Sequence, residues 1–174
     1  VVIRTITKIY ISIMRGTPLM LQLLVVYFGP YYVFRQNIST EYRFYATIIG
    51  FSINYAAYFA EIFRGGIQSI SRGQYEGAKV LGFTYKQTMW HIILPQVVKR
   101  VIPPLGNETI TLLKDTSLVY ILAMNDLMRV TRAFVQRDFD TTPFLVAGVF
   151  YLVCTAVLTK ILTYVENRYA VYEE

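Results

Sequence analysis

Ionisable and hydrogen-bonding side chains interrupt two of the most apolar stretches of this sequence, and these residues are the ones most able to do chemistry. In the stretch from Val101 to Met124 they recur three, four and seven residues apart, which places on one stripe of a helix Asn107, Glu108, Thr111, Lys114 and Asp115. The apolar stretch before it contributes Glu61. Charged groups at membrane depth are costly and usually functional. Carboxylates accept from an ammonium and a lysine holds a carboxylate, so this set could bind a small zwitterionic solute.

Two interpretations of these polar positions stay open at this point. The charged residues could form buried ion pairs that fix the packing of helices, or the stripe could line a water-filled path through a membrane. Acids outnumber bases among the positions, which favours a cationic or neutral solute over an acidic one.

Other chemistry is poorly supported. A single cysteine, Cys154, and a single histidine, His91, provide neither a disulfide framework, nor a Cys-rich metal site, nor a nucleophile with its base. No G-x-x-x-x-G-K-[ST] run is present to bind ATP. The net charge of +6 comes from small basic groups between apolar runs, unlike a nucleic-acid-binding stripe. We therefore predict no catalytic residue, no metal, no cofactor of the chain's own and no nucleic-acid partner.

Long apolar passages must position the polar residues. Of the 174 residues, 55% are hydrophobic and 16% charged, against about 45–50% and about 25% in soluble domains. We predict an all-α fold, a multi-pass transmembrane helical bundle formed by a single domain over residues 1–174. The spans are expected at about 9–34, 44–64, 97–124 and 141–165.

The most polar stretch lies between the second and third passages. Residues 65–100 carry five basic residues against one acid. Basic loops face the cytoplasm, so we expect this loop, and both ends of the chain, on the cytoplasmic side. Five arginines then fall on the outer side, against the usual bias; they are Arg35, Arg43, Arg129, Arg132 and Arg137.

The cytoplasmic loop, at about 72–95, predicts a helix–turn–helix. A short helix is expected from Glu76, with the acid in its first turn, where the helix dipole favours it. Gly82 would end that helix in a left-handed conformation. Thr84 would cap a second helix running to about Ile93, and Pro95 would end it.

The spacing in this loop resembles the EAA loop of ATP-binding-cassette importer permeases. Its pattern is Glu-X-Ala, three residues, Gly, nine residues and Ile-X-Leu-Pro, carried by Glu76, Ala78, Gly82, Ile92, Leu94 and Pro95. Gly77 stands where that family usually has alanine. The resemblance implies that the loop is a coupling helix that docks into a groove on a separate ATPase subunit.

Further segments are similar to the polar amino acid permeases within that family. They are Arg15-Gly-Thr-Pro-Leu19, Tyr58-Phe-Ala-Glu-Ile-Phe-Arg-Gly-Gly-Ile67, Leu105-Gly-Asn-Glu108 and Leu112-Leu-Lys-Asp-Thr-Ser-Leu118. The resemblance implies a non-enzymatic subunit in the cell membrane of a prokaryote that takes up polar amino acids. The excess of acids over bases at the polar positions adds a tilt toward basic ones. Implied partners are a pair of ATP-binding subunits, a second permease subunit in a homo- or heterodimer, an extracytoplasmic amino-acid-binding protein and the lipid bilayer. The resemblance also leads us to expect another spanning helix before Val1.

Two other classes of protein are weighed against this interpretation. An ion-coupled secondary transporter would use the same intramembrane charges, and a membrane scaffold would use the helices only as anchors. The first gives no reason for the spacing from Glu76 to Pro95, and the second none for a polar stripe in the third passage.

Overall fold

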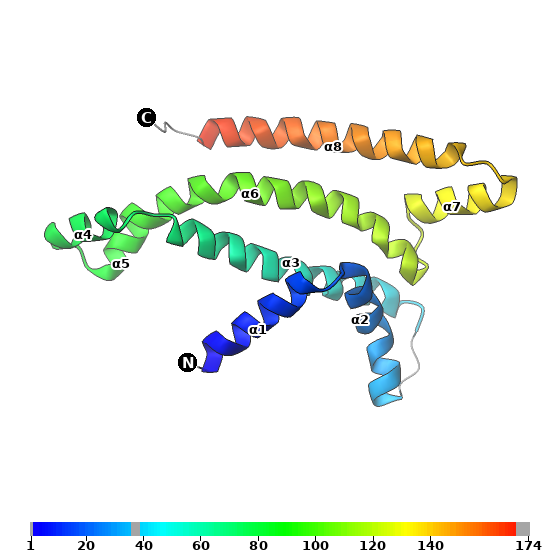
Figure 1. The fold of residues 1–174 in the computed structure, drawn as a ribbon, viewed down its shortest axis with the longest axis horizontal. Coiled ribbons are helices and arrows are strands. Elements are labelled where there is room, and N and C mark those ends of the chain that lie inside the picture. Colours follow the sequence, from blue (N-terminus) through cyan, green and yellow to red (C-terminus); the bar gives the residue numbers. More distant parts are fainter. Residues whose placement is uncertain (1, 36–38, 170–174) are drawn as a thin grey trace. The chain divides into compact units, whose positions relative to one another are not determined.

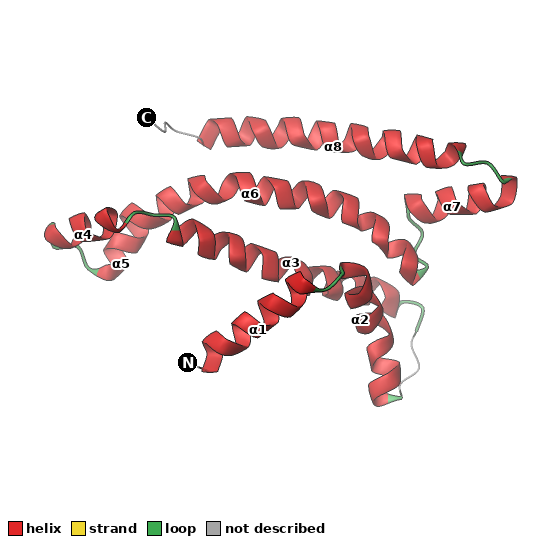
Figure 2. Cartoon of the chain, in the orientation of Figure 1, coloured by secondary structure: helices red, strands yellow, loops and turns green. Residues whose placement is uncertain are grey.

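The protein is described here by a computed structural model that covers residues 2–35 and 39–169. Within those ranges the regular structure is entirely helical (Figure 2), which confirms the predicted fold class. The chain divides into two units, Val1–Tyr58 with Thr111–Ala156 and Phe59–Ile110 with Val157–Glu174. Three long helices continue from one unit into the other (Figure 1); they are α3 (Tyr42–Gln68), α6 (Leu94–Asp115) and α8 (Thr142–Tyr169).

The first unit begins with two helices where the sequence predicts one kinked span. α1 (Val2–Gly16) and α2 (Leu19–Phe34) meet at an angle of 111° across a short break. The cause is Pro18, which has no backbone N–H to continue the hydrogen-bond ladder of α1.

Side chains take over the hydrogen bond that Pro18 cannot donate. The Met14 carbonyl, four residues earlier, accepts from the side-chain amides of Gln22 at 2.9 Å and Asn54 at 3.2 Å. Asn54 also donates to the Gln22 amide oxygen at 2.9 Å, and it is only 3% exposed. This buried amide pair therefore holds the bend and ties it to α3.

Close packing in the first unit depends on a glycine of α3. A Cβ atom at Gly50 would lie 2.7 Å from Cδ2 of Leu23, a fully buried residue of α2. The unit continues with the 3₁₀ segment η2 (Thr116–Leu122), α7 (Leu127–Asp138) and the beginning of α8.

The second unit packs the end of α3 against the beginning of α6. Its buried cluster is Ile70, Ile93, Val97 and Val101. A Cβ atom at Gly66 would lie 2.4 Å from Cγ1 of Val101, so only glycine allows the two helices this approach. The helices α4 (Arg72–Val80) and α5 (Tyr85–Thr88) connect α3 to α6 in the same unit (Figure 1).

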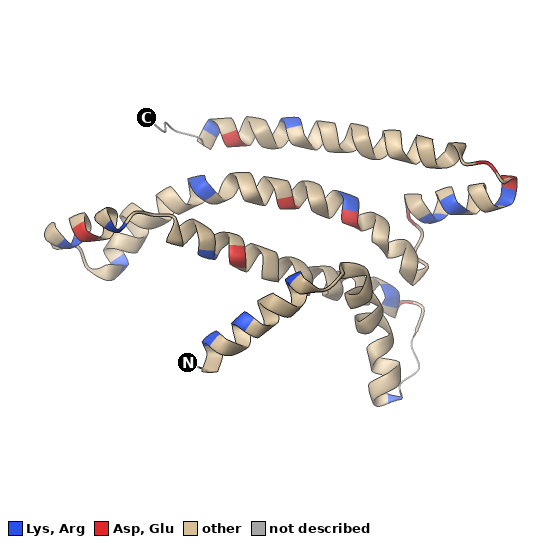
Figure 3. Cartoon of the chain, viewed as in Figure 1, with Lys and Arg blue, Asp and Glu red and all other residues tan. Residues whose placement is uncertain are grey.

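Two of the described helices, α3 and α8, are long and apolar enough to cross a membrane, and the pair α1 and α2 would add a third if counted as one bent span. The chain is thus a membrane protein. α6 does not meet that standard, because acidic and basic residues are distributed along it (Figure 3). The four predicted spans therefore stay a prediction.

Candidate functional site

The turn after α4 is built by local sequence signals. Gly82 has a φ of +76°, and the backbone N–H groups of Gly82 and Phe83 donate to the carbonyls of Lys79 and Ala78, both at 3.0 Å. This is a Schellman closure, which needs a residue tolerant of the left-handed conformation. The prediction that Gly82 ends the helix is confirmed.

The start of α4 was predicted wrongly. The helix begins at Arg72 with Ser71 as N-cap, so Glu76 lies in its interior and its first turn contains no acid. The reason is that Ser71 and the small or polar residues after it allow a helical start one turn earlier than the acid at Glu76 suggested.

The second helix begins as predicted but does not end as predicted. Thr84 accepts from the Gln87 backbone N–H, and the Gln87 side chain in return accepts from the Thr84 backbone N–H, which forms a complete capping box. A π-helical turn, η1 (Met89–Ile93), then leads directly into α6. Pro95 therefore does not end the helix.

The π turn explains how Pro95 is tolerated. The Leu94 backbone N–H reaches back five residues to the Met89 carbonyl, so the hydrogen-bond register shifts where Pro95 has no N–H to donate. Proline in the first turn of a helix costs little, since N–H groups there have no intrahelical partner. The helix that begins at Tyr85 and the predicted third passage are consequently one continuous helical path.

The segment formed by α4, the Gly82 turn, α5 and η1, residues 72–93, is named the coupling segment below. It exposes large apolar side chains, because Val80 is 87%, Leu81 74%, Tyr85 75% and Trp90 71% exposed. Of the predicted coupling residues, Ala78 is buried and Ile92 and Leu94 are half-buried, whereas the exposed ones are Glu76, Gly77, Gly82 and Pro95.

The predicted substrate residues are divided between the two units. Glu61, Asn107 and Glu108 belong to the second unit, and Thr111, Lys114 and Asp115 to the first. Five of the six lie on α6, and Glu61 lies on α3. Glu61, Glu108 and Asp115 are half-buried, while the exposed members are Asn107, Thr111 and Lys114.

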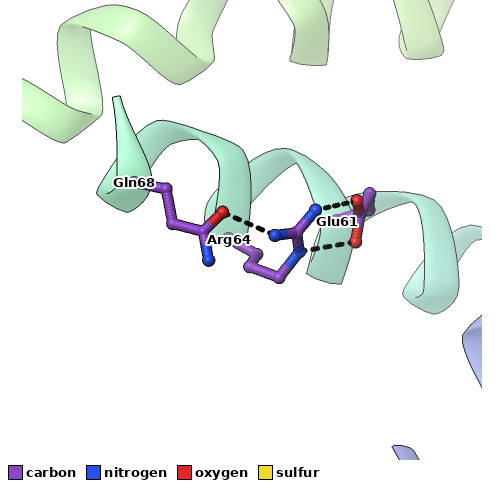
Figure 4. Close-up of polar contacts among 3 residues, drawn as sticks. All are labelled: Glu61, Arg64 and Gln68. Atoms are coloured by element: carbon purple, nitrogen blue, oxygen red, sulfur yellow. Dashed lines mark hydrogen bonds and ion pairs between the residues drawn. The ribbon is translucent and has the colours of Figure 1, made fainter. Parts of the chain in front are cut away.

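Glu61 forms an ion pair within its own helix. Both of its carboxylate oxygens accept from the Arg64 guanidinium, with 2.9 Å between Arg64 Nε and Glu61 Oε2, and Arg64 also donates to Gln68 (Figure 4). The pair spans one turn and is partly exposed, at 53% for the Arg64 and 27% for the Glu61 side chain. It therefore does not hold two helices together.

Glu61 also lines a hollow of about 370 Å³ in the second unit, whose other lining residues are Ile62, Gly65, Gly66, Ser69, Arg100 and Pro104. Arg100 donates to the Ser69 carbonyl just beyond the end of α3. The hollow thus offers a carboxylate and a guanidinium. The sequence analysis assigned Arg100 only to the basic loop. Its position six residues after Leu94, on the helix that carries the polar stripe, was the signal that it could belong to the site.

Asp115 is held from α3 within the first unit. The Tyr55 hydroxyl, on a side chain 6% exposed, donates to Asp115 Oδ2 at 2.8 Å. The Tyr55 ring lies between those of Phe51 and Tyr58, each with its centroid 6.2 Å away. Tyr55 was missed because nothing in its local sequence indicates a partner sixty residues away.

Comparison with known proteins gives consistent matches. Residues 1–171 match the family described as binding-protein-dependent transport system inner membrane component. The probable amino-acid ABC transporter permease YckA of Bacillus subtilis is 41% identical, over 95% of this chain and 72% of that protein. The arginine transport system permease ArtQ of the same organism is 40% identical, over 94% and 74%. The glutamate/aspartate import permease GltK of Escherichia coli is 37% identical, over 94% and 75%.

Two solved structures share the fold. A crystal structure of an amino acid ABC transporter with histidines superposes with a TM-score of 0.83 at 37% identity, over 92% of this chain and 74% of that one. The MetNI methionine ABC transporter, in an inward-facing form, gives a TM-score of 0.78 at 15% identity, over 98% and 76%. At that identity the second likeness concerns the fold alone.

Proposed function

Because the chain belongs to the family of binding-protein-dependent transport system inner membrane components, we propose that it is the permease subunit of an ATP-binding-cassette importer that takes up polar amino acids. Relatives at 41%, 40% and 37% identity are amino acid permeases. The chain would form the translocation path and couple it to ATP hydrolysis on a separate subunit.

The coupling segment is the observation that carries this proposal. The turn at Gly82, with its positive φ, and the Thr84 capping box fix the shape of this segment between two long helices. Its exposed Leu81 and Trp90 form a short apolar surface. Exposed apolar patches of this kind mark interaction sites. An ATPase subunit that closes on such a surface would push directly on α6, since the backbone runs from η1 into α6 without a break.

The substrate path is proposed along the polar face of α6. Glu108 and Asp115 would meet the amino group or side chain of the solute, and Asn107 would add a hydrogen bond. Lys114 and Thr111 would meet its carboxylate. Glu61 would act at the hollow that it lines with Arg100.

The charge balance of the site differs from the sequence-based expectation. Arg64 pairs with Glu61 and Arg100 joins the same hollow, so acids no longer outnumber bases. The tilt toward basic amino acids loses its support, and a zwitterion with an uncharged polar side chain fits equally well.

The proposed partners are those that membership of the family supports. We propose two ATP-binding subunits, a second permease-type chain related by an axis normal to the membrane, and an extracytoplasmic amino-acid-binding protein. The complex would lie in the inner or plasma membrane of a prokaryote.

The test is purification of the complex with its native partners, reconstitution in vesicles and measurement of ATP hydrolysis across a panel of amino acids. We expect a polar amino acid, presented by the binding protein, to stimulate hydrolysis and to accumulate inside the vesicles. Uptake driven by an ion gradient without ATP would overturn the proposal.

A further inference from the structure

Three arginines that the transport path does not use lie together in the first unit. They surround Ala123, the residue that ends η2 in a left-handed conformation with a φ of +56°. The Ala123 carbonyl accepts from Arg43 Nη1 at 3.4 Å and from the Arg129 guanidinium. One neutral oxygen thus draws together two like charges from α3 and α7, which repel each other.

Arg132 completes this group, named the arginine cluster below. Its guanidinium lies over the Tyr120 ring, 4.8 Å from the centroid. Arg129, Arg132 and Gln136 recur every three or four residues on one face of α7, and with Tyr120 and Ala133 they line a hollow of about 240 Å³. The Arg129 and Arg132 guanidinium groups are each held by one contact, and Arg43 by two, since its Nε also donates to the Tyr27 hydroxyl at 3.4 Å. All three keep further N–H groups for a ligand.

Three acids of α7 and the turns beside it are engaged elsewhere. Asp126 caps α7 by accepting from the backbone N–H groups of Met128 and Arg129. Asp138 is bound by Arg137, whose hydrogen bonds lower the Asp138 pKa. Asp140 accepts from the backbone and hydroxyl of Thr142, which lowers the Asp140 pKa. Among the residues that the structure describes, no carboxylate forms an ion pair with Arg129 or Arg132.

The opposite face of α7 is apolar. Leu127, Val130 and Phe134 line an apolar hollow with Pro143 and Val146 at the start of α8. The helix therefore carries its apolar and its cationic residues on opposite faces. Figure 3 shows the basic residues along α7.

We propose that the arginine cluster is a docking site for carboxylates on the surface of the extracytoplasmic amino-acid-binding protein; this rests on the proposed function and on the predicted topology, which places α7 outside. The same topology leaves Arg43, Arg129 and Arg132 as exceptions to the usual inner location of basic residues, and a docking role explains them.

A protein partner fits better than a free amino acid. The hollow is shallow and its arginines are exposed, and an exposed ion pair with a single small carboxylate is weak. Several carboxylates on one rigid surface act together, because complementary charges steer encounter and fix orientation.

The experiment uses the whole reconstituted complex and the binding protein that co-purifies with it, loaded with an amino acid. ATP hydrolysis is measured against binding-protein concentration for the wild type and for Arg129→Gln with Arg132→Gln. We expect the half-saturating concentration to rise about tenfold at low salt, with little change in maximal rate and a weaker salt dependence.

Two further variants make the result specific. Arg137→Gln is the matched control, since Arg137 is exposed on the same helix but is paired with Asp138 and lies over the Phe134 ring at 4.7 Å; it should behave as the wild type. The double lysine variant, Arg129→Lys with Arg132→Lys, keeps the charge and should restore most of the response, which shows that the glutamine variant assembles correctly.

Four outcomes would overturn the docking site. The double glutamine variant could match Arg137→Gln. Its defect could persist unchanged at saturating binding protein and depend on amino acid concentration, which would make the substrate carboxylate the ligand. The defect could vanish in vesicles of neutral phosphatidylcholine, which would indicate anionic lipid. Finally, loaded binding protein could fail to stimulate even the wild-type complex. That result would refute the proposed function itself, and it differs from a defect confined to the variant.

Discussion

The coupling segment and the polar face of α6 serve the two halves of the proposed mechanism, but they are stabilised in different ways. The turn and the cap of the coupling segment are formed by contacts within a few residues, namely the closure at Gly82 and the Thr84–Gln87 capping box, while Ile93 at its end packs against Ile70. The polar face depends on residues far away in sequence, as when Tyr55 holds Asp115. Local contacts make a rigid part that can transmit force, whereas distant contacts make a site that can respond to movement of a neighbouring helix.

The largest effect is expected at the Gly82 turn. A Cβ atom at Gly82 meets no atom within 4 Å, so the chain itself has room for a side chain there. Gly82→Asp should still abolish uptake, because a charge buried unpaired against the ATPase costs about 3 kcal/mol or more, over a hundredfold in docking affinity.

Gly82→Asn is the matched control for that prediction. Asparagine has nearly the same shape as aspartate and tolerates the left-handed conformation, so a substantial part of uptake should remain. Uptake is measured in vesicles after checking by blot that each variant reaches the membrane. Normal ATP-driven uptake by Gly82→Asp would contradict the coupling assignment.

The second effect tests the distant contact at Asp115. Asp115→Asn keeps the shape of the side chain and removes its charge, so uptake and substrate-stimulated ATP hydrolysis should fall while assembly and basal hydrolysis persist. Tyr55→Phe keeps the ring and removes only the hydroxyl donor. A hydrogen bond to a charged group contributes about 1.5–3 kcal/mol, so Tyr55→Phe should raise the apparent KM about tenfold or more.

These two variants separate a binding role from a packing role. If Asp115 only packs helices, its substitution should make the assembled complex dissociate, which size-exclusion chromatography would detect. If Asp115→Asn and Glu108→Gln both transport with unchanged apparent affinity, the substrate is bound elsewhere and the proposal for α6 fails.

The same contrast explains what the sequence could predict. The left-handed turn at Gly82 and the cap at Thr84 were predictable because their signals lie within four residues of each other. The predictions that the first helix starts at Glu76 and that Pro95 ends the second were wrong, since an acid is also tolerated inside a helix and a π turn lets the chain continue past proline. The Tyr55 contact could not be predicted, because it depends on how α3 packs against α6 within its unit. Arg100 had a signal that was not used, namely its position on the helix that carries the stripe.

A smaller effect should separate the two caps of the coupling segment. Thr84→Ala removes a cap that makes hydrogen bonds and should destabilise α5 by about 1 kcal/mol, which is about fivefold faster amide exchange at the start of that helix. Ser71→Ala is its control, since Ser71 caps α4 without a side-chain hydrogen bond. Hydrogen exchange of the intact complex measures both, and equal effects would show that the capping box does not stabilise the segment.

The smallest effect concerns the exposed pair of Glu61 and Arg64, which should contribute little to stability because solvent screens exposed ion pairs. The pair nevertheless tests whether Glu61 meets the solute, because its two halves can be removed separately. If Glu61 accepts from the substrate's ammonium, Glu61→Gln should raise the apparent KM a few-fold, and Arg64→Gln should lower it by releasing the carboxylate from its partner. If the pair is only structural, both variants should shift the KM in the same direction, and the double variant should equal either one. A double-mutant cycle on uptake distinguishes these cases, and a KM unmoved by either substitution would remove Glu61 from the proposed substrate path.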